Sequence, residues 1–320
     1  MSRKGGRHVT GEYGCTFIPS LVMNKDKRDT RMVTKFFYTR SEYEKENALL
    51  TKVRFADPAQ LIMKTTLPTD VDTKKINIDR IFEPRRSDRP GEFEENGANC
   101  KNVPQNPIEA KQYFKNMFFI QYPYSGISLN ELLTTSPITV ETSNNIIIGL
   151  GNLLKQLKRI NMRGFFHKDI HPGNITYSEV DKTCYLIDFG MFEKIDSIDR
   201  TTCFYDLLQF LAAVADVATA IETNQRQKKP PKISADKMRV LNLFNTVTYG
   251  QLRDIITSIV GSEPSADDSM VCSDKYNEII LQFDKFVNDY TKLQGGYTLK
   301  RSHKLLRKTL RRRKMRGNMH

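Results

Sequence analysis

Two short clusters of polar residues have the types and spacing that chemistry on a phosphate requires. The first is the run His167-Lys-Asp169-Ile-His171-Pro-Gly-Asn174, and the second is Asp188-Phe-Gly190. Transfer of a phosphoryl group needs a carboxylate near the acceptor hydroxyl and hard oxygen ligands for a divalent cation. Asp169 suits the first task, and Asn174 with Asp188 suits the second. The pattern therefore indicates a phosphoryl-transfer site carried by two loops.

The two histidines of the first cluster permit a second interpretation. His167 and His171 bracket Asp169, and a zinc site could use such a set of ligands. That interpretation gives no task to Asn174 or Asp188, so phosphoryl transfer explains more of the pattern. The glycine that follows Asp188-Phe189 is expected to let the backbone turn sharply.

The order and spacing of the two clusters resemble the protein-kinase superfamily, whose signature is H-x-D-[LI]-x-x-x-N followed by D-F-G. The resemblance implies an ATP-dependent phosphotransferase that requires Mg²⁺. It implies that Asp169 positions the acceptor and takes up its proton, and that His167 belongs to the catalytic loop. Asn174 and Asp188 are then the ligands of Mg²⁺, which binds together with ATP.

The resemblance also places weaker signals near the N-terminus. Gly11-Glu-Tyr-Gly14 resembles the end of a glycine-rich loop whose backbone N–H groups bind phosphates, although Val9 and Thr16 depart from its pattern. Lys35 resembles the strand lysine that contacts the α- and β-phosphates. The structure of the rest of this first segment is expected to be rich in strands.

The lysine needs a helix glutamate as its partner, and the sequence offers two. Glu46 falls on one helix face with Leu49, Leu50 and Val53, at spacings of i, i+3, i+4 and i+7. Because those apolar residues must point inward, Glu46 is the expected partner of Lys35, and Glu42 is the alternative. The run Ser41-Glu-Tyr-Glu44 is interpreted as the capping box that opens this helix.

Two further positions follow from the resemblance. The segment from Gln121 to Leu129 resembles the hinge between the lobes, where backbone groups of Gln121 and Tyr122 would bind the adenine. Asp206 resembles the buried helix aspartate that holds the backbone of the catalytic loop. A plain helix cap is the alternative role for Asp206.

The elements that must position these residues can be read from hydrophobic patterning. Strands are predicted at 31–38 and 117–121, a strand–loop–strand unit at 165–189, and helices at 203–222, 249–260 and 274–290. A further amphipathic helix has one apolar face, made of Ile146, Leu150, Leu153, Leu154 and Leu157. The predicted fold is α+β and kinase-like, with a β-rich N-lobe (1–121), a polar insertion at about 66–108, a helical C-lobe (122–298) and a basic tail (299–320).

Composition and charge indicate the kind of partner and the cellular compartment that suit this chain. The net charge is +13, and residues 299–320 carry ten Lys or Arg and no acidic residue, so the tail is predicted to bind nucleic acid or another polyanion. The five cysteines are scattered and odd in number, which disfavours a disulfide framework and suits a reducing, intracellular setting. The N-terminus lacks the apolar region of a secretory signal. The apolar stretch 207–221 is interpreted as a buried helix and not as a membrane span.

Departures from the family's pattern leave the substrate open. No Ala-Pro-Glu motif follows Asp188, and His171 stands where Ser/Thr kinases often have lysine. The chain resembles Ser/Thr protein kinases of large cytoplasmic DNA viruses, which implies a protein substrate and a place in the host cytoplasm or virion. The string His171-Pro-Gly-Asn174 is also similar to aminoglycoside- and choline-type kinases. A pseudokinase scaffold that binds nucleic acid is a third interpretation.

Overall fold

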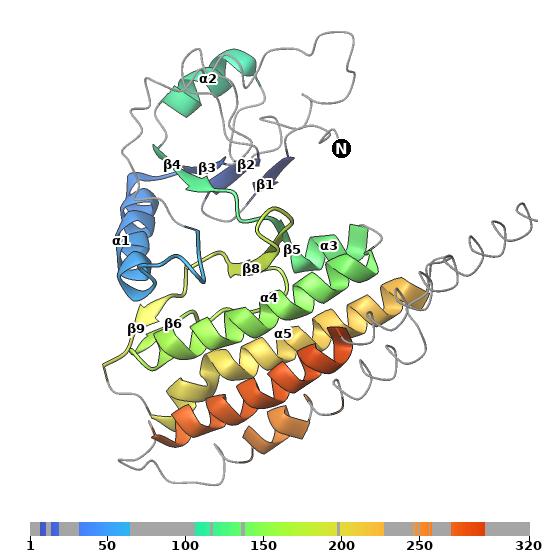
Figure 1. Cartoon of the computed structure of the whole chain (residues 1–320). Helices are drawn as coiled ribbons and strands as arrows, with labels where there is room; N and C mark the ends of the chain where they lie inside the picture. Colours follow the sequence, from blue (N-terminus) through green and yellow to red (C-terminus); the bar gives the residue numbers. More distant parts are fainter. Residues whose placement is uncertain are drawn as a thin grey trace, which may run out of the picture. The chain divides into compact units, whose positions relative to one another are not determined.

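The computed structural model describes residues 7–10, 14–18, 32–64, 106–115, 118–135, 138–196, 199–226 and 270–291, together with residues 246, 248, 250–255 and 257. The chain forms two compact units (Figure 1). The first comprises Met1–Gly126 and Ile187–Phe192, and the second comprises Ile127–Leu186 and Glu193–His320. The predictions for Gly11, for most of the insertion at 66–108 and for the basic tail at 299–320 lie outside the described residues.

An antiparallel sheet forms the first unit, with the order β1-β2-β3-β4. Its strands are β1 (Arg7–Thr10), β2 (Gly14–Ile18), β3 (Met32–Phe37) and β4 (Phe118–Pro123). The predicted strand at 31–38 is β3. The strand predicted at 117–121 continues to Pro123, so Gln121 and Tyr122 lie in a strand and not in a coil connector. Their Cα partners on β3 are Thr34 and Val33.

Helix α1 (Arg40–Ala56) begins two positions earlier than the sequence suggested. Its N-cap is Thr39, whose hydroxyl accepts a hydrogen bond from the Glu42 backbone at 3.2 Å, while the Glu42 carboxylate accepts one from the Thr39 backbone at 3.0 Å. This reciprocal pair is the capping box. The predicted box, Ser41 with Glu44, is therefore wrong, because the chain contains two overlapping matches and Ser41 lies inside the first turn.

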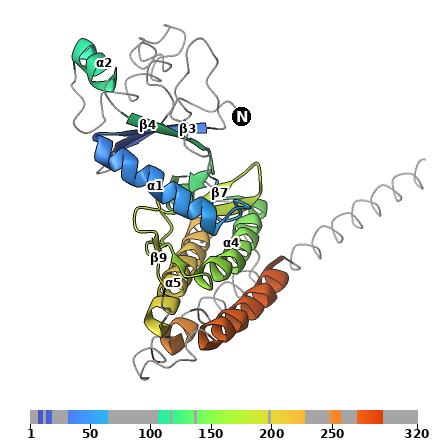
Figure 2. The same cartoon turned by 90° about the vertical axis from the view of Figure 1, so that its left-hand side faces the viewer.

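One side of the sheet packs against α1 (Figure 2). Side chains alternate along a strand, so Lys35 and Phe37 of β3 point to the same side as their neighbours on β4. That side forms the apolar cluster of the unit, in which Tyr43 stacks on Phe118 with ring centroids 5.3 Å apart. Its buried members are Phe37, Tyr43, Leu50 and Ile120. A second helix, α2 (Pro107–Lys115), begins where the polar insertion was expected to end.

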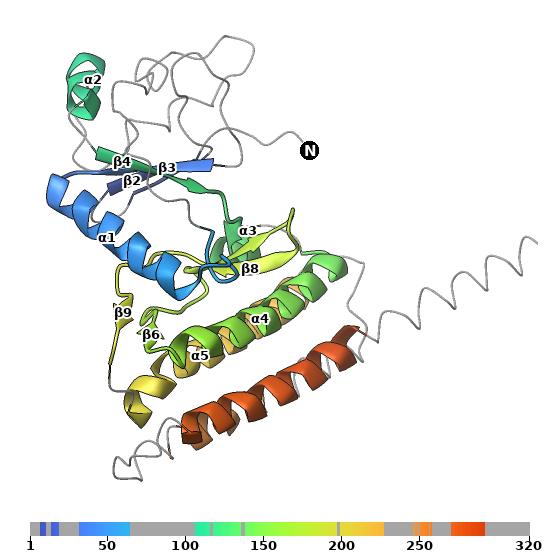
Figure 3. The same cartoon turned by 60° about the vertical axis from the view of Figure 1, so that its left-hand side comes forward.

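Long helices dominate the second unit. They are α4 (Val140–Asn161), α5 (Arg200–Arg226) and the helix at 270–291, which lie alongside one another (Figure 3). The shorter α3 (Leu129–Thr135) contacts α5, and residues 250–255 are helical. The predicted face of α4 is confirmed, since its apolar residues are almost fully buried: Ile146, Leu150, Leu153, Leu154 and Leu157. The helix predicted at 203–222 is α5, and it extends further at both ends.

Small strands flank the first polar cluster. β6 (Phe165–Phe166) pairs with β9 (Glu193–Lys194), and β5 (Ile127–Ser128) pairs with β7 (Ile175–Ser178), which pairs with β8 (Thr183–Leu186). The loop from His167 to Asn174 therefore begins at the end of one buried strand and ends at the start of another. Both ends of the loop are fixed to the core of the unit.

A disulfide joins Cys203 of α5 to Cys272, with Cα atoms 6.2 Å apart. The sequence did not predict this bridge, because spacing along the chain does not show which helices will lie together. Cys184 is a buried free thiol. Among the described residues, Thr201–Ile221 is the one helix whose length and composition would allow it to cross a membrane, and a buried core helix meets the same criteria.

Candidate active site

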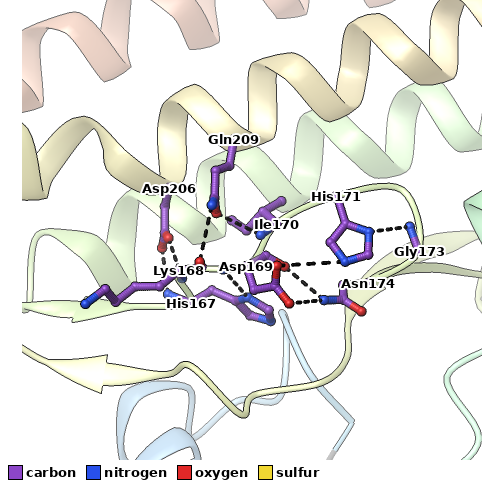
Figure 4. Close-up of polar contacts among 9 residues, drawn as sticks. All are labelled: His167, Lys168, Asp169, Ile170, His171, Gly173, Asn174, Asp206 and Gln209. Atoms are coloured by element: carbon purple, nitrogen blue, oxygen red, sulfur yellow. Dashed lines mark hydrogen bonds and ion pairs between the residues drawn. The ribbon is translucent and has the colours of Figure 1, made fainter. Parts of the chain in front are cut away.

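Helix α5 holds the loop between His167 and Asn174 through two polar side chains (Figure 4). Asp206 accepts hydrogen bonds from the backbone N–H of His167 and of Lys168, both at 2.8 Å. Gln209 accepts one from the N–H of Ile170 at 2.8 Å and donates one to the carbonyl of Lys168 at 3.2 Å. Since Asp206 and Gln209 are one helical turn apart, they face the same side. Four main-chain bonds thus fix the backbone on both sides of Asp169.

The residue before Asp169 has an unfavourable backbone conformation. Lys168 has a φ of +65°, in the left-handed region that non-glycine residues rarely adopt. Such a conformation persists only where the surroundings hold it in place. Here the backbone of Lys168 is held in this conformation by Asp206, which binds its N–H, and by Gln209, which binds its carbonyl. The same bonds fix the direction in which the Asp169 side chain points.

Asp169 and Asn174 lie together. The Asn174 amide nitrogen donates to the Asp169 carboxylate at 2.9 Å and to the Asp169 carbonyl at 3.0 Å. The Asp169 side chain is 45% exposed, whereas Asn174 is buried. Asn174 thus holds one carboxylate oxygen, Oδ2, whereas Oδ1 has its nearest charged neighbour in His171. Both amide hydrogens of Asn174 are used inside the loop, so its oxygen remains as an acceptor or ligand.

The two histidines of the loop each accept a hydrogen bond from a backbone N–H two residues further along the loop. His167 is fully buried, and its Nδ1 accepts the N–H of Asp169 at 3.3 Å. His171 is exposed, and its Nδ1 accepts the N–H of Gly173 at 3.1 Å. A Cβ at Gly173 would come within 2.7 Å of the His171 ring, so a larger residue there would require the exposed ring to shift. His171 Nε2 lies 3.9 Å from Asp169 Oδ1, which places a group that carries charge when protonated beside the carboxylate.

In the first unit, Lys35 and Glu46 form the predicted pair, with Nζ 3.2 Å from Oε1. The same carboxylate oxygen accepts the hydroxyl of Tyr122 at 2.9 Å. Lys35 and Glu46 are 25% and 17% exposed. The alternative partner, Glu42, is engaged in the helix cap and not with Lys35. From the sequence, only the backbone of Tyr122 was expected to take part in the site. The structure shows that its side-chain hydroxyl also takes part, through its bond to Glu46.

Asp188 belongs to the same unit, and its charge reaches Tyr122. Burial raises the pKa of Tyr122 well above its usual value, and the charges of Glu46 and then Asp188 raise it further. Asp188 itself adopts a φ of +59°. The backbone turns at Gly190, as expected, and the turn is closed by the Phe192 N–H, which donates to the Phe189 carbonyl at 2.9 Å; the left-handed conformation itself is at Asp188. Aspartate tolerates this region better than most side chains.

The remaining predicted residues have simpler positions. Gly14 is the first residue of β2, opposite Phe37 of β3. The Gln121 amide donates to the Thr34 hydroxyl at 3.4 Å across the sheet. The sequence analysis missed two contributions to the site: the side chain of Gln209, which binds the loop backbone, and the hydroxyl of Tyr122, which binds Glu46. The i, i+3 spacing of Gln209 from Asp206 on an apolar helix was the available signal for the first.

The donor chemistry fits a magnesium ion in complex with a nucleotide. Asp188 offers a carboxylate and Asn174 an amide oxygen, which are hard ligands of the kind Mg²⁺ prefers. Within the described part of the chain, no cluster of three or more His, Cys, Asp and Glu residues could hold a metal ion.

The comparisons with known proteins agree with this chemistry. The profile of the ABC1 atypical kinase-like domain matches residues 110–220, about a third of the chain. Serine/threonine-protein kinase D from Synechocystis is 34% identical over 135 residues, which cover 41% of this chain and 24% of that protein. Mitogen-activated protein kinase 12 of Danio rerio and of Mus musculus are each 29% identical over 80 residues, covering 25% of this chain and 21% of theirs.

These similarities support a kinase-like domain and a kinase-like phosphotransferase. The chain matches less than a quarter of the length of each of these relatives. The profile match contains the catalytic loop, Asp188 and Asp206, whereas Lys35 and Glu46 lie before it. The match supports the use of ATP and a divalent metal in general terms.

Proposed function

We propose that this chain is a protein kinase that transfers the γ-phosphoryl group of ATP to serine or threonine hydroxyls. The observation that carries the proposal is the loop at 167–174, in which the Asp169 side chain is about half exposed while four hydrogen bonds from α5 hold the backbone on both sides of it. The similarity to Ser/Thr protein kinases supports a protein acceptor.

Each predicted residue has a task in this proposal. Asp169 Oδ1 accepts the proton of the acceptor hydroxyl, whose oxygen then forms the new bond to the γ-phosphorus as the bond to ADP breaks. Asn174 holds the other carboxylate oxygen and so fixes the direction of Oδ1. Lys35, held by Glu46, binds phosphate oxygens. When bound, Mg²⁺ neutralises charge on the phosphates, and Asn174 and Asp188 would hold it.

A second candidate is a kinase of small molecules. Two observations favour it: the string His171-Pro-Gly-Asn174 and the similarity to an atypical kinase-like domain. The acceptor distinguishes the two candidates. Purified chain would be incubated with γ-labelled ATP and Mg²⁺, against basic and Ser/Thr-rich proteins in one series and against sugars and choline-like amines in another.

The expected result is label on protein serine or threonine that disappears in the Asp169→Asn variant. Label on a sugar or amine alone would replace the proposal with the second candidate. Label on neither acceptor class, together with ATP binding, would favour the pseudokinase interpretation. We also propose an intracellular place, in host cytoplasm or virion, which the scattered cysteines and the sequence resemblance support.

We further propose that residues 299–320 bind nucleic acid or another polyanion independently of catalysis. The ten cationic residues without one acidic residue support this. If about five of them contact phosphates, log K should fall with log[salt] with a slope of about −4 to −5. Fluorescence anisotropy of labelled DNA and RNA across a salt series measures this slope. Binding that survives deletion of 299–320 would contradict the proposal.

A further inference from the structure

The helix at 270–291 contributes a buried tyrosine to the support of the catalytic loop. Tyr276 is fully buried, and its hydroxyl donates a hydrogen bond to Oδ1 of Asn161, the last residue of α4. Tyr276 and Asn161 are far apart in sequence, and both belong to the second unit. The bond joins the C-terminal end of α4 to a helix that none of the predicted site residues occupies.

Asn161 passes this contact on to Asp206. Its amide nitrogen donates to Asp206 Oδ2 at 2.9 Å and to the carbonyl of Phe165 at 2.8 Å. Asp206 Oδ2 is also the oxygen that accepts the N–H of His167. A continuous chain of buried hydrogen bonds therefore runs from Tyr276 through Asn161 and Asp206 to the backbone beside Asp169.

The donor and acceptor roles in this chain allow one arrangement. A carboxylate and a carbonyl only accept, so the Asn161 nitrogen must face Asp206 and Phe165. The Asn161 oxygen must then face Tyr276, whose hydroxyl has to donate. Burial raises the pKa of Tyr276 well above its usual value, and the charge of Asp206 adds to the effect, so the hydroxyl keeps its proton. Without this donor, the buried oxygen of Asn161 loses its partner.

The disulfide joins the helix that carries Tyr276 to α5, which carries Asp206. Cys203 lies one turn before Asp206 on α5, and Cys272 lies one turn before Tyr276. The helix at 270–291 is therefore tied to α5 beside the hydrogen-bonded chain. This observation is independent of the bonds themselves, and it places Tyr276 in a fixed position relative to Asp206.

We propose that Tyr276 is a positioning residue for phosphoryl transfer, acting through Asn161 and Asp206 to fix the catalytic loop. The proposal rests on the proposed function of Asp169. It predicts that loss of one hydroxyl on a remote helix changes turnover more than nucleotide binding, because the backbone at Lys168 is strained and relaxes when Asp206 shifts.

The test compares Tyr276→Phe with Tyr290→Phe. Tyr290 is a matched control: it is on the same helix, is fully buried, and its hydroxyl bonds the Ser143 hydroxyl at 3.2 Å near the other end of α4. In Tyr276→Phe, kcat should fall about 10–100-fold, the range that a small misplacement of reacting groups can produce. KM for ATP should change less than about twofold, and Tyr290→Phe should keep kcat within about twofold of wild type.

A second measurement does not need activity. Amide hydrogen exchange at 165–170 reports the N–H groups of His167 and Lys168 that Asp206 binds. Tyr276→Phe should speed exchange there by about tenfold or more, and Tyr290→Phe should not. If wild type shows no phosphotransfer, the proposed function fails while the exchange data still test the positioning. Unchanged exchange, or equal effects of the two variants on exchange and kcat, would overturn the role of Tyr276.

Discussion

The loop at 167–174 and the cluster of Lys35, Glu46 and Tyr122 are held in place by different kinds of contact. The loop at 167–174 is bound through its main chain to Asp206 and Gln209 on a buried helix. Lys35 is held by a single carboxylate oxygen of Glu46, which it shares with Tyr122. Main-chain bonds in a buried setting fix a conformation, whereas a partly exposed ion pair fixes mainly a charge. The two regions should therefore respond differently to the loss of one side chain.

The largest effect is expected for Asp206→Ala. It leaves three donors without their acceptor: the N–H groups of His167 and Lys168, and the Asn161 amide. Each unsatisfied buried group costs about 1–3 kcal/mol, so the free energy of unfolding should fall by about 3–5 kcal/mol. Activity should be lost with it. Denaturant titration measures the first change and phosphotransfer the second.

The matched control for this prediction is Asp216→Ala, which removes an exposed aspartate from the same helix. It should change the free energy of unfolding by less than about 0.5 kcal/mol. If Asp206→Ala were equally mild, the loop would not depend on α5, and the contrast between the two regions would disappear.

A smaller loss of stability, with a clear loss of activity, is expected for Glu46→Gln. The amide still accepts the Tyr122 hydroxyl, but it removes the charge that holds Lys35. Because the pair is partly exposed, the free energy of unfolding should change by about 1 kcal/mol or less. Turnover should fall on the order of 10–100-fold, since Lys35 loses its orientation.

Glu44→Gln serves as its control on α1, because that carboxylate bonds the exposed Arg40. Steady-state kinetics of Glu46→Gln, Lys35→Ala and the double variant would show whether the pair acts as a unit, with effects far from additive. Additive losses would show that Lys35 and Glu46 act separately, contrary to this account.

The smallest loss of activity is expected for Tyr122→Phe. It removes one hydrogen bond to Glu46 and leaves the ion pair with Lys35 in place. A hydrogen bond to a charged group contributes about 1.5–3 kcal/mol, so the free energy of unfolding should fall by about that amount or less. Turnover should fall less than in Glu46→Gln. A larger loss than Glu46→Gln shows would mean that the tyrosine, and not the ion pair, orients the cluster.

The sequence was most informative where a local pattern carries the contact. The resemblance to kinases implied a helix glutamate as the partner of Lys35, and helical spacing on α1 then favoured Glu46 over Glu42, as the structure confirms. The apolar face of α4 was evident for the same reason. Asp206 was expected to hold the loop backbone, and the hydrogen bonds are present.

Contacts between segments that are far apart in the chain could not be predicted, because they leave no local pattern in the sequence. Tyr276 meets Asn161, and Cys203 meets Cys272, only because the helix at 270–291 lies beside α4 and α5, and no spacing in the chain encodes that. The capping box failed for a different reason. Thr39 with Glu42 and Ser41 with Glu44 fit the motif equally well, and which pair caps the helix depends on where β3 ends.

We propose that Asp169 takes the acceptor proton in a phosphoryl transfer. A comparison of wild type with Asp169→Asn tests this role most directly. Turnover with γ-labelled ATP and thermal stabilisation by ATP with Mg²⁺ would be measured on the same preparations of wild type and Asp169→Asn. The account predicts a fall in turnover on the order of 10²–10⁴-fold, with equal stabilisation by the nucleotide. Near-normal turnover in Asp169→Asn would contradict the account.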